Sequence, residues 1–140
     1  MTLSWAFEDE STALTVAVLK SLETTQALVP ALWPFEVASV LSNADRRGRM
    51  NPVAQTAFLE RLRVLPIAIE HRPAAWLAQQ ILPLARRHEI SVYDAAYLEL
   101  AIREGLPLAT LDDELRHAAC ADGVACVGRR RIRDERDASR

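Results

Sequence analysis

The stretch "VYDAAYLELA", residues 92–101, decides how the rest of the chain is interpreted. Its composition predicts a helix, and at about 100° per residue Glu99 and the following Arg103 fall on one side of it. Asp94 falls almost opposite them, on the side expected to be buried. An unpaired buried carboxylate costs free energy, so the sequence predicts that something compensates the charge of Asp94.

The overall composition is typical of one globular domain. The chain has 140 residues, of which 50% are hydrophobic and 26% charged, which suffices for a single core. A net charge of −2 neither favours nor excludes nucleic-acid binding, because local basic patches decide it. We expect a cytoplasmic protein without a membrane span, since no long apolar run or signal peptide is visible. Cys120 and Cys126 lack metal-site spacing and are interpreted as thiols in a reducing cytoplasm.

Helical and extended patterns alternate along the chain. Helical periodicity covers residues 11–23, 34–47, 52–64, 73–88, 92–104 and 113–121. Short apolar stretches lie at 27–31, 66–70, 107–111 and 124–128. This alternation predicts an α/β fold with a largely parallel sheet. Pro83 is expected to kink or split the fourth helix, and residues 129–140 to form a charged tail beyond a domain of residues 1–128.

Three acids occupy matching places in this pattern. Glu36 and Asp94 lie in the first turns of their predicted helices, and Asp112 directly follows the apolar stretch 107–111. In parallel α/β sheets such positions gather at the carboxyl ends of the strands, where ligand sites form. The three carboxylates would repel one another unless a cation lay between them, and oxygen ligands suit Mg²⁺ or Mn²⁺.

Each acid also has a purely structural interpretation. Ser91 and Asp94 resemble a capping box, in which a serine and an acid satisfy the first amides of a helix. Asp112 is a good N-cap, and Glu36 favours the dipole of its helix. Spacing alone leaves both interpretations open.

The stretches "LSWAFEDE" (3–10), "LVPALWPFEVASVL" (28–41) and "VYDAAYLELAIREGLPLATLDDEL" (92–115) resemble the VapC family, the PIN-domain toxins of bacterial type II toxin–antitoxin modules. The resemblance extends from Leu3 to Val127. It implies a three-layer α/β/α fold around a mostly parallel sheet and a Mg²⁺- or Mn²⁺-dependent endoribonuclease. It further implies a cognate antitoxin, an RNA substrate such as tRNA or rRNA, and a homodimer.

The resemblance also assigns roles to individual residues. It implies that Glu36 of "PFEVA", Asp94 of "VYDAAY" and Asp112 of "ATLD" are the catalytic, metal-binding acids. Thr110 matches the hydroxyl residue that accompanies the last acid. Asp113 could substitute or assist, although it also fits an exposed acid at a helix start. The bound cation would lower the pKa of a water and neutralise charge on the phosphate, with Glu36 as a ligand or as the group that orients the water.

The sequence departs from the family at its beginning. The family's usual first strand ends in an Asp, and by alignment of "LSWAFEDE" this Asp would fall before Met1. Glu8, Asp9 and Glu10 lie too late to replace it. We therefore expect the first strand to be missing, the neighbouring strand ladders to be exposed and metal binding to be weakened. A start site assigned too far downstream and a shortened, catalytically impaired module that retains antitoxin binding or dimerisation remain alternative explanations.

Basic and aromatic residues receive structural interpretations. Two basic clusters end predicted helices and could contact phosphates or simply complement helix dipoles: Arg46, Arg47 and Arg49, and Arg86, Arg87 and His88. The run 129–131 could serve RNA or solvate the tail. Six aromatic residues are predicted to lie in the core or a dimer surface, not to stack on bases: Trp33, Phe35, Phe58, Trp76, Tyr93 and Tyr97.

Overall fold

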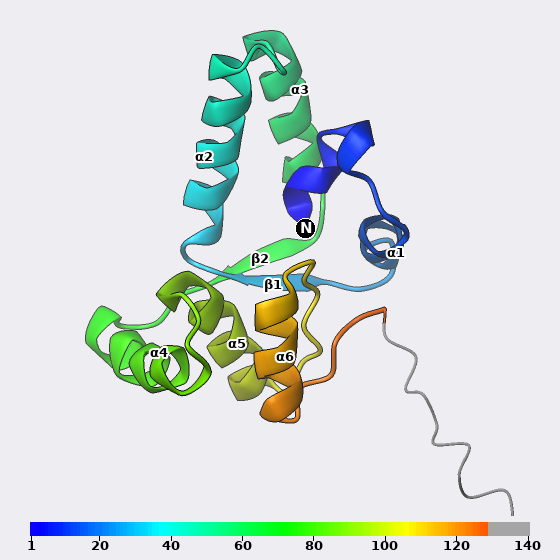
Figure 1. The fold of residues 1–140 in the computed structure, drawn as a ribbon. Coiled ribbons are helices and arrows are strands. Elements are labelled where there is room, and N and C mark those ends of the chain that lie inside the picture. The colour runs from blue at the N-terminus through cyan, green and yellow to red at the C-terminus, as the bar shows by residue number, and fades with distance from the viewer. Residues whose placement is uncertain (129–140) are drawn as a thin grey trace, which may run out of the picture.

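A computed structural model describes residues 1–128, apart from the side chains of Thr2 and Leu3. Strands β1 (Ala27–Pro30) and β2 (Ile67–Glu70) pair in parallel. The helices are α1 (Ala13–Ser21), α2 (Trp33–Arg46), α3 (Pro52–Arg63), α4 (Ala74–His88), α5 (Val92–Glu104) and α6 (Asp113–Ala121). Figure 1 shows the strands between the α2–α3 pair on one side and α4, α5 and α6 on the other. The predicted α/β class is confirmed, while residues 129–140, with the basic run, lie outside the described residues.

All six predicted helices form, with ends within two residues of the predicted ones. Local sequence explains several of these ends. The side chains of Thr12, Asn51 and Ser91 each accept a hydrogen bond from a backbone N–H in the first turn of α1, α3 and α5. Gly105 ends α5 with a φ of +63°, a conformation that costs little without a Cβ.

Helix α4 continues through Pro83 and is not split there. A proline inside a helix removes one backbone hydrogen bond and leaves a carbonyl without its donor. Pro83 is exposed, so water can satisfy that carbonyl. The opposite face of α4 packs against the protein core, which stabilises the helix as far as His88.

The sheet is smaller than the sequence pattern predicted. Only two of the four expected strands form a continuous ladder; the stretches 107–111 and 124–128 meet in a single parallel bridge between Leu108 and Cys126. A cavity of about 390 Å³ is lined by β1 on one side and by residues 106–109 on another. Among the described residues, β1 pairs with β2, and the segment around Leu108 pairs only with that around Cys126.

Residues 1–26 contain no strand. Two short 3₁₀ helices, η1 (Thr2–Trp5) and η2 (Glu8–Glu10), precede α1. The indole Nε1 of Trp5 donates to the backbone oxygen of Thr15 at 2.9 Å. This bond attaches η1 to α1, so the beginning of the described chain packs as turns against the α2–α3 side (Figure 1).

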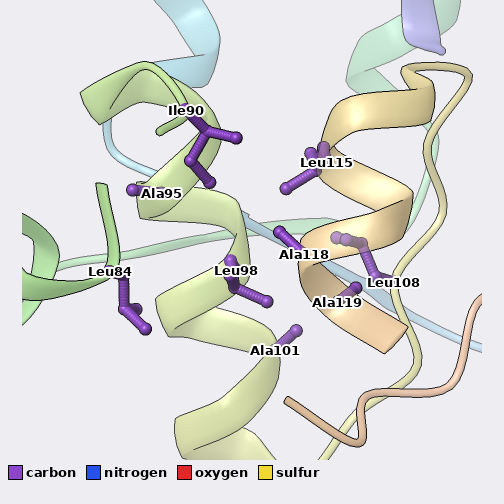
Figure 2. Close-up of a cluster of buried hydrophobic side chains, with 9 residues drawn as sticks. All are labelled: Leu84, Ile90, Ala95, Leu98, Ala101, Leu108, Leu115, Ala118 and Ala119. Carbon is purple, nitrogen blue, oxygen red and sulfur yellow. The ribbon is translucent and has the colours of Figure 1, made fainter. Parts of the chain in front are cut away.

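Two hydrophobic clusters hold the helices on their two sides of the strands. Val37 and Leu41 of α2 pack with Phe58 and Leu62 of α3. The larger cluster joins α4, α5 and α6 to the extended segment around Leu108, and its side chains converge between the helices in Figure 2. Its buried members are Leu84, Ile90, Ala95, Leu98, Ala101, Leu108, Leu115, Ala118 and Ala119. This second cluster fixes the starts of α5 and α6, where Asp94 and Asp112 lie.

Helix α5 is buried on more sides than its charge pattern predicted. Glu99, expected to face solvent, is only 5% exposed, because α5 contacts β1 as well as α4 and α6. Arg103 donates to the two oxygens of Glu99 at 2.8 and 3.3 Å and to Glu70 of β2 at 3.1 Å. The side of α5 that carries Glu99 and Arg103 was expected to lie opposite the buried one, yet Glu99 is buried there and pairs with Arg103, which is partly buried.

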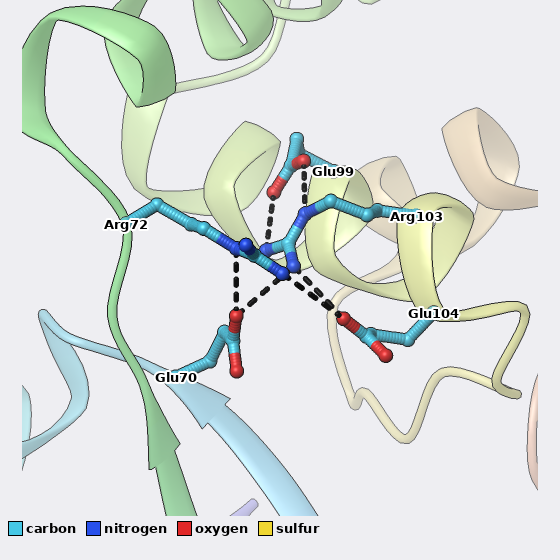
Figure 3. Close-up of polar contacts among 5 residues, drawn as sticks. All are labelled: Glu70, Arg72, Glu99, Arg103 and Glu104. Carbon is cyan, nitrogen blue, oxygen red and sulfur yellow. Dashed lines mark hydrogen bonds and ion pairs between the residues drawn. The ribbon is translucent and has the colours of Figure 1, made fainter.

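This ion pair is part of a network that Figure 3 shows at the end of β2. Arg103 also donates to Glu104 at 2.8 Å, and Arg72 pairs with Glu70 at 2.9 Å. Both guanidinium groups lie over the ring of Trp76, at 5.8 Å for Arg72 and 5.5 Å for Arg103. We call Glu70, Arg72, Glu99, Arg103 and Glu104 the arginine network.

Candidate active site

Glu36, Asp94 and Asp112 line one cavity of about 430 Å³. Glu36 comes from the first turn of α2 and Asp94 from the first turn of α5, while Asp112 is the N-cap of α6. Glu36 lies close to a proline at the start of α2 and Asp94 follows the N-cap Ser91, whereas Asp112 itself caps α6. The structure therefore brings together three acids that are far apart in the sequence, and we call this cavity the acid pocket.

Asp94 is half-buried at the wall of the acid pocket. Burial raises the pKa of its carboxyl, a hydrogen bond with Ser91 opposes this rise, and the negative charge of Asp112 adds to it. The hydroxyl of Ser91 accepts from the backbone N–H of Asp94 at 3.0 Å. The serine half of the predicted capping box is therefore present. The carboxylate of Asp94 still faces the negative charge of Asp112.

Asp112 caps its helix and faces the pocket at the same time. Its Oδ1 accepts from the backbone N–H of Leu115 at 2.8 Å. The hydroxyl of Thr110, a residue only 9% exposed, accepts from the backbone N–H of Asp112 at 3.1 Å. The structural and functional interpretations of Asp112 are compatible, because a cap needs one carboxylate oxygen and leaves the second one available.

Asp113 is directed elsewhere. Its carboxylate contacts the guanidinium of Arg116 one turn further along α6. Arg116 also donates to the backbone oxygen of Thr110 at 3.0 Å. Asp113 is not among the residues that line the acid pocket, although it directly follows Asp112, which is.

Glu36 contacts a residue that sequence reasoning had assigned to the core or a dimer surface. The hydroxyl of Tyr97 donates to Oε1 of Glu36 at 2.5 Å, and Tyr97 lines the acid pocket. Burial raises the pKa of Tyr97 far above its usual range, and the charges of Glu36 and Asp94 add to that rise. The phenol therefore stays protonated. The spacing of Asp94 and Tyr97, three residues apart on one helix, was the signal that could have revealed this residue.

The acid pocket contains no lysine or arginine among its lining residues. Members of the two basic clusters noted in the sequence pair with other acids. Arg49 pairs with Asp9 and Glu10, each at 2.9 Å, and its guanidinium lies 4.4 Å from the centre of the Phe7 ring. His88 and Arg87 both contact Asp122. Within residues 1–128, these arginine and histidine side chains thus pair with acids outside the pocket, whereas Met1 lines the pocket and its amino group interacts with Glu36.

The donor atoms of the pocket fit a hard divalent cation. Carboxylate and hydroxyl oxygens are the ligands that Mg²⁺ and Mn²⁺ accept most readily. Among the described residues, however, no three aspartate, glutamate, histidine or cysteine side chains are already gathered closely enough to hold a metal ion. The carboxylates of Asp94 and Asp112 are close enough for the negative charge of Asp112 to contribute to the raised pKa of Asp94.

Comparisons with known proteins agree with this architecture. The PIN domain family model matches residues 2–120. "Ribonuclease VapC3" of Mycobacterium tuberculosis (strain CDC 1551 / Oshkosh) is 35% identical over 102 residues, which cover 73% of this chain and 72% of that protein. "Ribonuclease VapC3" of Pyrobaculum aerophilum is 36% identical over 81 residues, 58% of this chain and 62% of that protein. In the described part of the chain, no helix has both the length and the apolar character for a membrane span. The chain belongs to the PIN-domain family and, within it, to the VapC ribonucleases.

Proposed function

We propose that the chain is a toxin endoribonuclease of a type II toxin–antitoxin system that hydrolyses RNA phosphodiesters with Mg²⁺ or Mn²⁺ in the cytoplasm. The single observation that carries this proposal is the meeting of Glu36, Asp94 and Asp112 in one pocket that has no lysine or arginine in its lining. Three acids that line one pocket without a lysine or arginine beside them are costly to bring together. A divalent cation would compensate their charges, including the charge of Asp94 for which the sequence predicts a compensating group.

The pocket residues have separate roles in this proposal. Asp94 and Asp112 would hold the cation. Their side chains would rotate to bring the carboxylates within ligand distance of one ion. Glu36 would complete the ligand set or accept a proton from the attacking water. The hydroxyl of Thr110 supports Asp112 by accepting a hydrogen bond from the backbone N–H of Asp112. When bound, the cation supplies a Lewis acid that stabilises the charge developing on the phosphate.

RNA cleavage by the purified full chain tests the proposal. We expect cleavage that depends on Mg²⁺ or Mn²⁺ and falls at least about a hundredfold in Asp94→Asn, since one charge-stabilising group is worth about 10²–10³ in rate. Glu104→Gln is the matched control, because Glu104 belongs to the arginine network. Metal-dependent cleavage that Asp94→Asn leaves unchanged would contradict the assignment of the acid pocket.

The proposal includes two protein partners, a cognate antitoxin and a second copy of the chain. A homodimer is supported by an apolar groove of about 330 Å³ lined by Leu77, Ile81 and Leu82 of α4 and Val92 of α5. Leu82 and Val92 are exposed although they are large and apolar, as is common in interfaces. Light scattering should give a dimer mass that Leu82→Arg converts to a monomer mass; a monomeric wild type would contradict the homodimer.

A second candidate function is a PIN module that binds an antitoxin or dimerises without cleaving RNA. The observation that favours it is the lack, within residues 1–128, of three metal-ligating side chains already in place. The two candidates differ in one property, which is the affinity for a divalent cation. A chain that forms the antitoxin complex but neither binds Mn²⁺ nor cleaves RNA would establish this second function.

A further inference from the structure

We propose that Tyr97 is a positioning residue of the acid pocket, whose hydroxyl holds the carboxylate of Glu36 toward the ion that Asp94 and Asp112 share. This inference rests on the proposed function and adds a fourth residue to the site. Tyr97 touches neither substrate nor metal in this account. It acts through Glu36.

The location of Tyr97 carries the first step of the inference. Tyr97 lies three residues after Asp94 on α5, so the two side chains leave the same face of the helix. It lines the acid pocket together with Glu36 and Asp112. Its hydroxyl therefore lies in the region where the side chain from α2 meets those from α5 and α6.

The mobility of Glu36 carries the second step. Glu36 is exposed at the start of α2, and a glutamate has three side-chain torsions that solvent leaves unrestricted. Tyr97 supplies the one hydrogen bond that its carboxylate receives from the described residues, through Oε1. A carboxylate with one oxygen fixed and the other available can join a cation with less loss of conformational entropy.

The stability of the ring supports the third step. Tyr97 is partly buried and packs against the cluster that joins α4, α5 and α6. The aromatic ring is thus fixed by the protein core, whereas its hydroxyl reaches the pocket. Removal of the oxygen atom alone, in Tyr97→Phe, leaves the packing in place and tests only the hydrogen bond.

Mn²⁺ affinity, measured by electron paramagnetic resonance on the full chain, gives the first readout. Because hydrogen bonds to charged groups are among the stronger ones, we expect Tyr97→Phe to weaken Mn²⁺ binding about five- to tenfold. Tyr93→Phe is the matched control, because Tyr93 lies on the same helix, is 63% exposed and does not line the acid pocket. Its affinity should equal that of the wild type.

A double-mutant cycle separates positioning from a general structural effect. If Tyr97 acts through Glu36, adding Tyr97→Phe to Glu36→Gln should change Mn²⁺ affinity much less than it does in the wild-type background. Equal losses in both backgrounds would overturn the inference, as would wild-type affinity in Tyr97→Phe. Absence of saturable Mn²⁺ binding in the wild type would instead overturn the proposed metal site together with this inference.

A metal-free readout is available because the chain has two tyrosines. In Tyr93→Phe, the ultraviolet resonance Raman doublet of tyrosine reports on Tyr97 alone. We expect a strong hydrogen-bond donor signature that weakens when Glu36→Ala is added. An identical doublet in both proteins would overturn the contact on which the inference stands, whatever the metal measurement gives.

Discussion

The two ends of helix α5 carry acids in opposite electrostatic situations. At its C-terminal end, Glu99 is buried against Arg103 in the arginine network (Figure 3). At its N-terminal end, Asp94 faces the acidic Asp112, and no arginine or lysine lines their pocket. One group of acids is paired with arginine side chains and the other is not. The difference indicates that the arginine network stabilises the fold, whereas the proposed function assigns the compensation of the acid pocket to a bound divalent cation.

The largest effect that sharpens this comparison is expected in the arginine network. Arg103→Ala leaves Glu99 buried without its partner, and breaking a buried ion pair costs about 3 kcal/mol. We expect the free energy of unfolding to fall by about that amount in urea denaturation. Arg63→Ala is the control, because Arg63 and Glu60 form an exposed pair at 3.8 Å, and such pairs contribute less than about 1 kcal/mol. Equal losses of stability in the two variants would contradict a structural role for the arginine network.

Asp112 allows the cap and the ligand to be separated. Asp112→Asn keeps an oxygen that can accept from the backbone N–H of Leu115, whereas Asp112→Ala removes it. We expect Asp112→Ala to lose about 1 kcal/mol of stability and Asp112→Asn to lose little. Both should lose Mn²⁺ binding, because both remove the negative charge. Retained Mn²⁺ binding in Asp112→Asn, measured by calorimetry, would reduce Asp112 to a helix cap.

The smallest expected effect is the pH dependence that Asp94 adds to stability. Its pKa in the folded chain is raised from 3.8, chiefly by burial, so the folded state binds more protons than the unfolded state just above pH 3.8. The metal-free wild type should therefore lose stability as the pH rises through the interval between the two pKa values. Above that interval Asp94→Asn should be the more stable protein, by less than about 1 kcal/mol because Asp94 is partly exposed.

Thermal unfolding in the presence of a chelator measures this difference. The advantage of Asp94→Asn should disappear near pH 3 and reach its full size at neutral pH. A wild type that is more stable than Asp94→Asn at neutral pH without metal would show that the carboxylate is compensated within the protein. Asp94 would then resemble Glu99, and the contrast between the two ends of α5 would be lost.

The sequence allowed the helices and the site acids to be predicted, for different reasons. Helix periodicity and caps such as Asn51 and Ser91 act over a few residues, so the six helices could be predicted from local patterns. The joint location of Glu36, Asp94 and Asp112 was predicted from the rule that ligand sites form at the carboxyl ends of parallel strands. Only Glu36 directly follows a strand in the structure, since α5 follows α4 and the stretch before Asp112 forms a single bridge. The family resemblance adds their proposed roles.

Features that depend on contacts distant in the sequence could not be predicted. The burial of Glu99 required knowledge that β2 brings Glu70 and Arg72 to the end of α5. The hydrogen bond between Tyr97 and Glu36 joins residues 61 positions apart. The stretches 107–111 and 124–128 have strand composition, yet they pair in one bridge only. Strand pairing depends on which segment lies alongside, and local composition does not specify that segment.

Calorimetric titration of Mn²⁺ into the full chain tests the central claim most directly. We predict one saturable binding event that is lost or weakened at least about tenfold in each of Glu36→Gln, Asp94→Asn and Asp112→Asn, and unchanged in Glu104→Gln. Loss in all three single variants would show that acids from α2, α5 and α6 share one ion. Binding that is unaffected by the three substitutions, or no saturable binding in the wild type, would contradict the account.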